Sequence, residues 1–334
     1  MEYIIGSNGK SDSLRMTGGN MRYKEFGKTG EKISALTVGT WAIGGAGWGD
    51  VNKNDSIQAI HAMLDCGVNS IDTAPGYNFG ESERVVGEAI KGRRDKVFVT
   101  TKTGVYNTKE APFVKDCRRE TVIRLCEESL KNLQTDYIDL MLIHWPDIEY
   151  NTPFEETMRA LEDLKKAGKI KYVGLSNFSK EQIEDISQYG EITAFEPPYS
   201  MVNRSQEDLM KWTAEQGIAN MTYGSLGAGI LTGAIRELPN FAPDDMRLNF
   251  YDFFKEPKFS KVMDLLKVLD KIAEEHEVPV AQVAVNWNAQ KDFVTTSLCG
   301  VRNVQEAVEN CSGFEWSLSE EEMKVIDQAI DTYL

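Results

Sequence analysis

Four side chains that can donate, accept or stabilise a proton lie at or just after the ends of short apolar runs. Asp72 ends one such run, Lys102 and His144 directly follow two others, and Tyr77 stands in the Pro- and Gly-containing loop after Asp72. A free tyrosine has a pKa of about 10, and an ammonium group beside the phenol stabilises the phenolate and lowers that pKa. We therefore expect Lys102 to activate Tyr77 as a general acid and base.

The other two residues complete this chemistry. Asp72 would keep Lys102 charged and in place, and a neutral His144 would donate an N–H to a carbonyl oxygen and orient it. Such a set polarises a C=O group and delivers a proton to it, but it contains neither a strong nucleophile nor a metal site. The reaction therefore needs a hydride from elsewhere, which predicts a nicotinamide cofactor.

Taken singly, each of these residues has an ordinary structural explanation. An aspartate after a strand is commonly a helix cap, and a lysine in a loop is commonly a solvated charge. A histidine before Trp-Pro or a loop tyrosine is commonly a packing residue. The joint occurrence of all four at successive run ends is what favours a functional site.

The elements that must position these residues alternate regularly along the chain. The pattern predicts eight strands, each followed by a helix, over 36–40, 68–72, 96–101, 137–143, 170–175, 194–196, 219–223 and 293–297. Such alternation gives parallel strands with right-handed crossovers, and eight units close as a (β/α)8 TIM barrel of the α/β class. An N-terminal β-hairpin over 23–35 precedes the barrel, and additional C-terminal helices over 304–310 and 319–333 close it. All four residues then face the carboxyl-end rim.

The alternative architecture is an open, doubly wound sheet with a dinucleotide-binding turn. That turn carries a GxGxxG pattern between a strand and a helix. The glycines at 44, 45, 47 and 49 are separated from the next predicted helix by residues 51–54. The barrel is therefore favoured over the open sheet.

Composition excludes several classes of protein. The chain has 334 residues, 41% of them hydrophobic, and a formal net charge of −15. Such a charge disfavours nucleic acid and anionic membranes as partners, since both bind clustered Lys and Arg. The sequence contains no run of about 18 apolar residues that would predict a membrane span, and its N-terminus lacks a signal-peptide pattern. We expect a cytoplasmic protein with a small-molecule substrate; the composition leaves the oligomeric state open.

Cysteine and histidine usage agrees with that expectation. The five cysteines form no CxxC pair, so we interpret them as reduced thiols. The three histidines form no HExxH motif, which disfavours a zinc site. Residues 1–20 are Gly-, Ser- and Asn-rich and are expected to be a flexible extension, with residues 21–334 forming one barrel domain.

Five motifs, in order, give the chain a family resemblance. They are IDTAPGYNFGESE from Ile71, TTK at 100–102, LIHWP at 142–146, GLSNFS at 174–179 and GVRNVQEAVEN at 300–310. With these motifs the chain resembles the aldo-keto reductase superfamily, and within it the bacterial group related to inositol- and sugar-linked reductases and to potassium-channel β subunits. The resemblance runs from about Met21 to the C-terminus. It implies a (β/α)8 barrel that binds NADP(H), with Tyr77 as acid and base and Asp72, Lys102 and His144 completing a catalytic tetrad.

The resemblance also implies a set of cofactor contacts. Ser176 and Asn177 match the pair that binds the nicotinamide carboxamide, and Tyr223 matches the aromatic residue that stacks on the ring. The implied contacts further along the cofactor are Gly224, Ser225, Leu226 and Gly229 at the pyrophosphate, Trp41 and Gly300 on the rim, Arg302 at the 2′-phosphate and Asn310 at the adenine. Arg302 has the alternative explanation of a surface charge at a helix start.

Two positions depart from the family pattern. Glu196 stands where the family has Gln; a carboxylate accepts from the carboxamide NH2 but cannot donate to its oxygen, and could alternatively bind a substrate hydroxyl. Glu306 stands where the family has Gln or Arg near the adenosine phosphate. A carboxylate repels a phosphate unless Arg302 screens it. NADP(H) is therefore the family expectation, while Glu306 leaves NAD(H) as the alternative.

The substrate is less well defined. Aromatic residues expected to line the rim are Trp41, Trp48, Phe79, Trp145 and Tyr199, which suit a sugar, polyol or other carbonyl compound. The long loop 233–260 is expected to fold over the cofactor. The predicted function is NAD(P)H-dependent interconversion of an aldehyde or ketone and its alcohol. The alternative is a nicotinamide-sensing regulatory subunit with little turnover.

Overall fold

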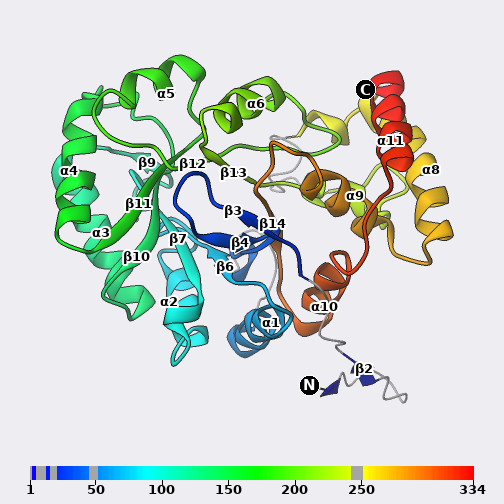
Figure 1. Cartoon of the computed structure of the whole chain (residues 1–334), viewed down its shortest axis with the longest axis horizontal. Coiled ribbons are helices and arrows are strands. Elements are labelled where there is room, and N and C mark those ends of the chain that lie inside the picture. The colour runs from blue at the N-terminus through cyan, green and yellow to red at the C-terminus, as the bar shows by residue number, and fades with distance from the viewer. Residues whose placement is uncertain (1, 5–12, 16–20, 45–51, 242–250) are drawn as a thin grey trace.

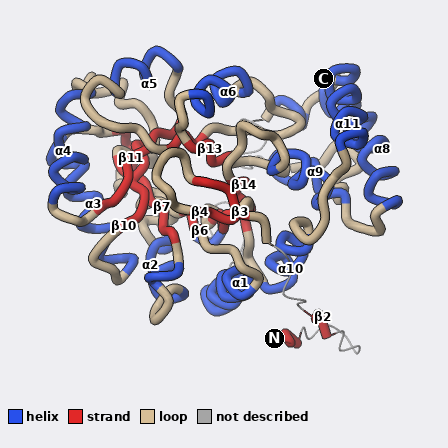
Figure 2. The backbone as a smooth tube through the Cα atoms, in the orientation of Figure 1, coloured by secondary structure: helices blue, strands red, loops and turns tan. Residues whose placement is uncertain are grey.

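The centre of the protein is a closed barrel of parallel strands in the order β10-β11-β12-β13-β14-β5-β6-β7 (Figures 1 and 2). The computed structural model describes residues 2–4, 13–15, 21–44, 52–241 and 251–334. The barrel strands are β5 (Leu36–Gly39), β6 (Ser70–Asp72), β7 (Phe98–Thr103), β10 (Ile138–Ile143), β11 (Ile170–Ser176), β12 (Ala194–Glu196), β13 (Ala219–Thr222) and β14 (Thr296–Gly300). The predicted (β/α)8 barrel is confirmed.

Helices surround this barrel (Figure 1). They are α1 (Lys53–Asp65), α2 (Glu81–Ala89), α3 (Arg119–Leu133), α4 (Phe154–Lys166), α5 (Lys180–Ile186), α6 (Glu207–Glu215), α8 (Lys258–Glu275), α9 (Val280–Ala289), α10 (Val304–Ser312) and α11 (Glu320–Tyr333). Short 3-10 helices are η1 (Ala42–Gly44), η2 (Arg94–Lys96), η3 (Gly227–Thr232) and η4 (Asp252–Phe254). Side chains define several starts: Asn52 caps α1, and Ser179 and Ser319 form capping boxes on α5 and α11.

Three two-stranded sheets accompany the barrel among the residues that the structure describes. The first pairs β1 (Glu2–Ile4) with β2 (Ser13–Arg15), inside the segment expected to be a flexible extension. The second pairs β3 (Tyr23–Glu25) with β4 (Lys32–Ser34), as predicted. The third pairs β8 (Val105–Tyr106) with β9 (Val114–Lys115), which the strand pattern did not indicate. This third hairpin follows β7 and so lies on the carboxyl-end side of the barrel.

The second hairpin closes the amino-terminal end of the barrel. Phe26 and Ile33 are completely buried and pack with Leu140 and Leu142 of the barrel interior. Lys24 adds a polar anchor, since its Nζ donates to the carbonyl oxygens of Ala289 and Val294, at 2.8 and 2.6 Å. Because this end is filled by side chains, chemistry is confined to the opposite rim.

The last strand differs from the prediction of 293–297. It spans Thr296–Gly300, in register with β5 so that Ser297 faces Leu36 and Gly300 faces Gly39. Phe293 instead packs edge-on against Tyr199, with ring centroids 5.6 Å apart. Phe293, which the sequence pattern assigns to the strand, belongs instead to a separate apolar cluster with residues of α8, α9 and α11.

The long loop after β13 is described only at its two ends. Phe241 packs edge-on against the buried Phe254, with centroids 5.0 Å apart, so both flanks are fixed to the body of the protein. Residues 242–250 lie outside the described residues, and the expected closure over a cofactor stays a prediction. In the portion of the chain that is described, no helix combines the length and the apolar character needed to cross a membrane.

Candidate active site

Barrel order brings three of the predicted residues to adjacent strands. Asp72 is the last residue of β6, Lys102 lies in β7, and His144 directly follows β10. β6 pairs in parallel with β7, and β7 with β10. The carboxyl ends of these strands meet at one rim, where the loop that carries Tyr77 begins.

Lys102 is the buried centre of the site. Its Nζ lies 2.6 Å from each carboxylate oxygen of Asp72 and 3.1 Å from the carbonyl oxygen of Thr73. Lys102 is 0% and Asp72 only 2% exposed. Burial opposes the lysine charge, but Asp72 and Glu196 outweigh burial and raise the pKa of Lys102. Lys102 is therefore an ammonium group that Asp72 holds in place.

Tyr77 lies between Lys102 and the mouth of the barrel. Its ring centroid is 5.2 Å from Lys102 Nζ, 6.0 Å from the His144 ring in an edge-on arrangement, and 6.3 Å from the Trp41 ring in a stacked one. Burial raises the pKa of Tyr77, Lys102 lowers it, and the carboxyl groups of Asp72 and Glu196 raise it again. The pKa of Tyr77 is therefore raised and not lowered as expected, mainly because burial outweighs the one ammonium.

His144 is held as a neutral imidazole. Burial, the Lys102 charge and the Lys115 charge together lower the pKa of His144 well below its usual value. Its buried Nδ1 has no hydrogen-bond partner among the described residues. A neutral imidazole donates through one nitrogen only, so His144 suits the predicted role of orienting a carbonyl oxygen next to Tyr77.

Glu196, the last residue of β12, is buried together with Lys102 and Asp72. We call these three residues the Lys102 cluster. Glu196 Oε1 lies 3.3 Å from Lys102 Nζ, and its Oε2 is buried with no hydrogen-bond partner in the described part of the chain. Burial and the nearby Asp72 raise the pKa of Glu196 well above its usual value, against the effect of Lys102. A protonated carboxyl group both donates and accepts. The sequence suggested that Glu196 can only accept hydrogen bonds. In its protonated form Glu196 can also donate one, as the Gln of the family pattern can.

The residues expected at the nicotinamide form one hydrogen-bonded chain. Tyr223 Oη donates to Asn177 Oδ1 at 2.8 Å, and Asn177 Nδ2 donates to Ser176 Oγ and to the carbonyl oxygen of His144, both at 3.0 Å. Ser176 Oγ donates in turn to the carbonyl oxygen of Glu196 at 2.9 Å. These bonds fix the three residues beside Glu196 and His144, so a ring placed on Tyr223 would lie next to the Lys102 cluster.

Glycines leave an open path along the rim from this chain. A Cβ at Gly224, Gly229 or Gly300 would meet no atom within 4 Å, and the φ angles of +70° at Gly224 and +95° at Gly229 favour glycine. Close approach of an extended cofactor therefore fits. The Gly229 N–H already donates to the carbonyl oxygen of Leu226, at 3.1 Å, and the Ser225 hydroxyl turns inward to the carbonyl oxygen of Leu298. These two groups do not face the open path in this structure.

Arg302, Glu306 and Asn310 lie at and along α10. The Arg302 guanidinium donates to Glu306 Oε1 at 2.7 Å, and the Arg302 backbone N–H donates to Oε2 at 2.8 Å. Asn310 Nδ2 donates to the carbonyl oxygen of Gly300 at 3.1 Å. The predicted phosphate-binding cation is therefore already paired with the carboxylate that was expected to oppose it.

The predicted aromatic rim is partly present. Trp41, Phe79 and Trp145 are 40%, 61% and 38% exposed around the mouth. Sequence reasoning missed Lys115 of β9, whose Nζ lies 4.6 Å from the centre of the Trp145 ring and whose charge acts on His144. No motif marks Lys115, since only the unforeseen β8–β9 hairpin brings it to the mouth. Trp48 lies outside the described residues.

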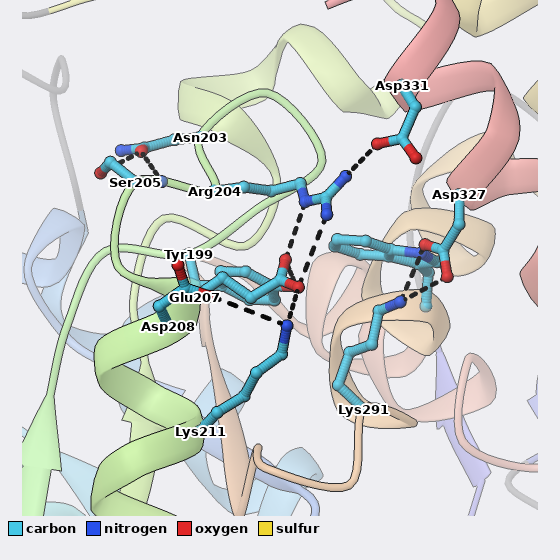
Figure 3. A network of polar contacts seen from close by, with 11 residues as sticks. Tyr199, Asn203, Arg204, Ser205, Glu207, Asp208, Lys211, Lys291, Asp327 and Asp331 are labelled. Carbon is cyan, nitrogen blue, oxygen red and sulfur yellow. Dashed lines mark hydrogen bonds and ion pairs between the residues drawn. The ribbon is translucent and has the colours of Figure 1, made fainter.

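Tyr199 does not line the rim. It is 1% exposed and stacks on Trp287, with ring centroids 5.5 Å apart. Its hydroxyl donates to Glu207 Oε2 at 2.9 Å, within a polar network in which Arg204 also joins Glu207 to Asp331 of α11 (Figure 3). Tyr199 supports the site only indirectly, because its backbone N–H donates to the carbonyl oxygen of Tyr223 at 3.1 Å.

Comparisons with known proteins agree with this geometry. A family model described as "Aldo/keto reductase family" matches residues 35–331. The chain is 38% identical to "Aldo-keto reductase YhdN" of Bacillus subtilis (strain 168), over 93% of this chain and 94% of that protein. It is 33% identical to the "NADH-specific methylglyoxal reductase" of Escherichia coli (strain K12), over 90% and 95%. The solved glycerol dehydrogenase AKR11B4 from Gluconobacter oxydans superimposes with a TM-score of 0.84 at 33% identity, covering 96% and 97%.

Proposed function

Because this chain belongs to the aldo/keto reductase family, we propose that it reduces an aldehyde or ketone to the alcohol, and runs the reverse reaction, with Tyr77 as the general acid and base. The observation that carries the proposal is the position of the Tyr77 ring, 5.2 Å from the Lys102 ammonium and 6.0 Å from a neutral His144. A positioned acid of this kind contributes roughly 10²–10⁴-fold to the rate of proton transfer.

Each residue has a distinct task in this reaction. His144 donates an N–H to the carbonyl oxygen and fixes its direction. Tyr77 gives its hydroxyl proton to that oxygen, and Lys102 stabilises the phenolate that remains. Asp72 keeps Lys102 oriented through its two 2.6 Å contacts. The nicotinamide cofactor, when bound, supplies the hydride.

The residues in this structure fit a nicotinamide cofactor. The chain from Tyr223 through Asn177 to Ser176 would hold the carboxamide, and a protonated Glu196 would add both a donor and an acceptor. The open path over Gly224, Gly229 and Gly300 would take the extended part. We propose that the Arg302–Glu306 pair makes the choice between NADP(H) and NAD(H) a close one, since a 2′-phosphate must displace Glu306 whereas a ribose hydroxyl can bind it.

The substrate class proposed here is a small oxygenated carbonyl compound. The half-exposed Trp41 and Trp145 offer flat apolar faces, and Lys115 adds one cation at the mouth. Relatives named for methylglyoxal and glycerol support small substrates of this kind. We also propose a cytoplasmic location, because all five cysteines are free thiols, which suits a reducing compartment.

The test is a cofactor-oxidation assay on the purified protein. NADPH and NADH are each followed by absorbance with methylglyoxal and a panel of sugar aldehydes, and glycerol is tested with the oxidised cofactors. Turnover with at least one carbonyl compound is expected. Tight cofactor binding with no turnover on the whole panel would instead support the nicotinamide-sensing regulatory subunit.

A further inference from the structure

The Lys102 cluster contains one more carboxyl group than it has cations to balance. Asp72 occupies the ammonium with two contacts of 2.6 Å, while Glu196 Oε1 lies 3.3 Å away. Lys102, Asp72 and Glu196 are all 2% exposed or less. Two ionised carboxylates on one ammonium would leave an uncompensated negative charge in a place that water does not reach, which is strongly unfavourable.

A proton on one carboxyl group removes that excess charge. Asp72 is the better anion, because both of its oxygens accept short, charge-assisted bonds from Lys102. Glu196 is the better acid, because its contact is longer and its Oε2 has no acceptor or donor partner among the residues described. The raised pKa of Glu196, caused by burial and by Asp72, agrees with this assignment.

Resting on the function proposed above, we propose that Glu196 holds a proton in the resting protein and, through Lys102, replaces the proton that Tyr77 gives to the substrate. Glu196 is thus an ionisable proton store at a position where the family pattern has an amide. An amide has the same shape and can bind the same groups, but it has no proton to give at neutral pH.

The proton transfers balance. In reduction the Tyr77 O–H bond breaks, its proton forms the new O–H bond of the alcohol, and Tyr77 becomes a phenolate. Lys102 then gives one N–H proton to the phenolate, and the Glu196 O–H proton passes to the resulting Lys102 amine. Tyr77 and Lys102 return to their starting forms, Glu196 becomes a carboxylate, and no electrons move beyond those of the hydride. After product leaves, Tyr77 is half-buried at the mouth and meets solvent, and a proton returns from there through Tyr77 and Lys102 to Glu196.

Contacts within the cluster support this route. Lys102 is the one group that lies both 3.3 Å from Glu196 Oε1 and over the Tyr77 ring, at 5.2 Å from its centre, within the described part of the site. The ionisable groups that face Glu196 are Asp72 from β6, Lys102 from β7, Tyr77 from the loop after β6 and Tyr223 after β13. Only Lys102 among them is a cation, so it is the natural relay.

The first test detects the stored proton directly and needs neither cofactor nor substrate. Infrared spectra of the wild type and of Glu196→Gln are compared in the region of protonated carboxyl C=O stretching at neutral pH. The wild type is expected to show a protonated-acid band that Glu196→Gln lacks. Identical spectra in this region would overturn the proposal. Glu83→Gln serves as the matched control, since Glu83 is a second buried acid, bonded to Thr101 and Asn132 and outside the site.

The second test separates proton supply from the chemistry itself. Glu196→Gln should keep a near-normal first turnover in stopped flow, because Tyr77 still carries its own proton. Later turnovers should slow by roughly a hundredfold, the lower part of the range for a positioned proton-transfer group. Glu196→Asp should restore part of the lost rate, and Glu83→Gln should leave the pH profile unchanged. Equal steady-state rates and pH profiles for Glu196→Gln and wild type would overturn the relay.

These two tests distinguish failure of this inference from failure of the proposed function. A Glu196 band in a protein that reduces no carbonyl compound would overturn the function and with it the relay, while establishing Glu196 as an acid. Carbonyl reduction without that band would leave the function standing and overturn the proton store.

Discussion

Arg302 and Glu306 face each other across one turn at the start of α10, with the guanidinium NH2 2.7 Å from Oε1 and the Arg302 backbone N–H 2.8 Å from Oε2. The pair is partly exposed, at 49% and 28% of the two side chains, so it contributes little to stability. We propose that its importance lies in recognition, because a ligand phosphate that binds Arg302 would have to compete with Glu306.

Replacing Glu306 therefore changes cofactor preference. Glu306→Gln releases Arg302 and removes a repulsive charge, so the affinity for NADPH should rise by about fivefold, or about 1 kcal/mol, as expected for an exposed charge. NADH affinity should fall or stay level. Tryptophan fluorescence titrations with both cofactors measure this, and Arg302→Gln is the control that should weaken NADPH alone. Parallel changes for both cofactors would contradict it.

Loss of the phenol should abolish turnover selectively. Tyr77→Phe removes the proton that is transferred but keeps the ring between Lys102 and His144, so kcat should fall by roughly a thousandfold. Cofactor affinity should stay within about twofold, since Tyr77 is not among the proposed carboxamide contacts. Steady-state kinetics and fluorescence titration check the two parts. Near-normal kcat in this variant would remove Tyr77 from the mechanism.

Removal of the buried cation should destabilise the fold as well as the chemistry. Lys102→Met leaves the Asp72 carboxylate buried without a counter-charge, and breaking such a buried pair costs about 3–5 kcal/mol of unfolding free energy. Urea denaturation measures the loss. Adding Asp72→Asn to Lys102→Met should recover part of it, because the double variant no longer buries that carboxylate. No recovery in the double variant would show that the loss comes from packing.

His144 should make the folded protein less stable at acid pH. Its pKa in the folded protein lies well below the value of about 6.5 in an unfolded chain, so the unfolded state binds the proton first as the pH falls. Stability from this residue is therefore complete above about pH 6.5 and decreases below it, by at most about 1.4 kcal/mol per pH unit. Denaturation at pH 5.5 and 7.5 should show a smaller acid loss for His144→Gln than for wild type. Equal acid losses would contradict a neutral His144.

Lys115 should favour substrates that carry a negative charge. It lies beside Trp145 at the mouth, and Lys115→Gln removes that charge while keeping a polar side chain of similar reach. For a carboxylate-bearing aldehyde such as glyoxylate, kcat/KM should fall by about fivefold, or about 1 kcal/mol, the scale of an exposed charge interaction. Methylglyoxal, which is neutral, is the matched comparison. Equal losses on both would point to an effect on His144 instead.

The barrel, and the placing of Asp72, Lys102 and His144 at one rim, were predictable because both follow from local rules. Regular alternation of strands and helices sends the ends of successive strands to one rim, and Asp72, Lys102 and His144 stand at such ends. Tertiary context decided the rest. Tyr199 comes two Pro residues after β12 and turns into the cluster of Trp287 and Phe293, which no local pattern indicates.

Protonation was harder to predict than position. The sequence shows that Glu196 replaces an amide, but its charge depends on the distances from Lys102 to two carboxyl groups, 2.6 Å and 3.3 Å. Burial, which no sequence pattern reveals, is the main cause that reverses the expected direction of the Tyr77 pKa. Lys115 was missed because strands of two residues, as in β8 and β9, carry no detectable period.

The order of strands around the barrel separates the residues of the candidate site into two arcs. The proposed catalytic residues lie on β6 and β7 or directly after β6 and β10, while Ser176, Glu196 and Tyr223 lie on or directly after β11 to β13, and the two arcs adjoin where β10 pairs with β11. We infer that loops of the first arc can change, and with them the substrate, while the proposed cofactor contacts of the second arc stay in place. Glu196 is the exception, because it belongs to the second arc but contacts Lys102 of the first. A substitution of Glu196 therefore affects both arcs.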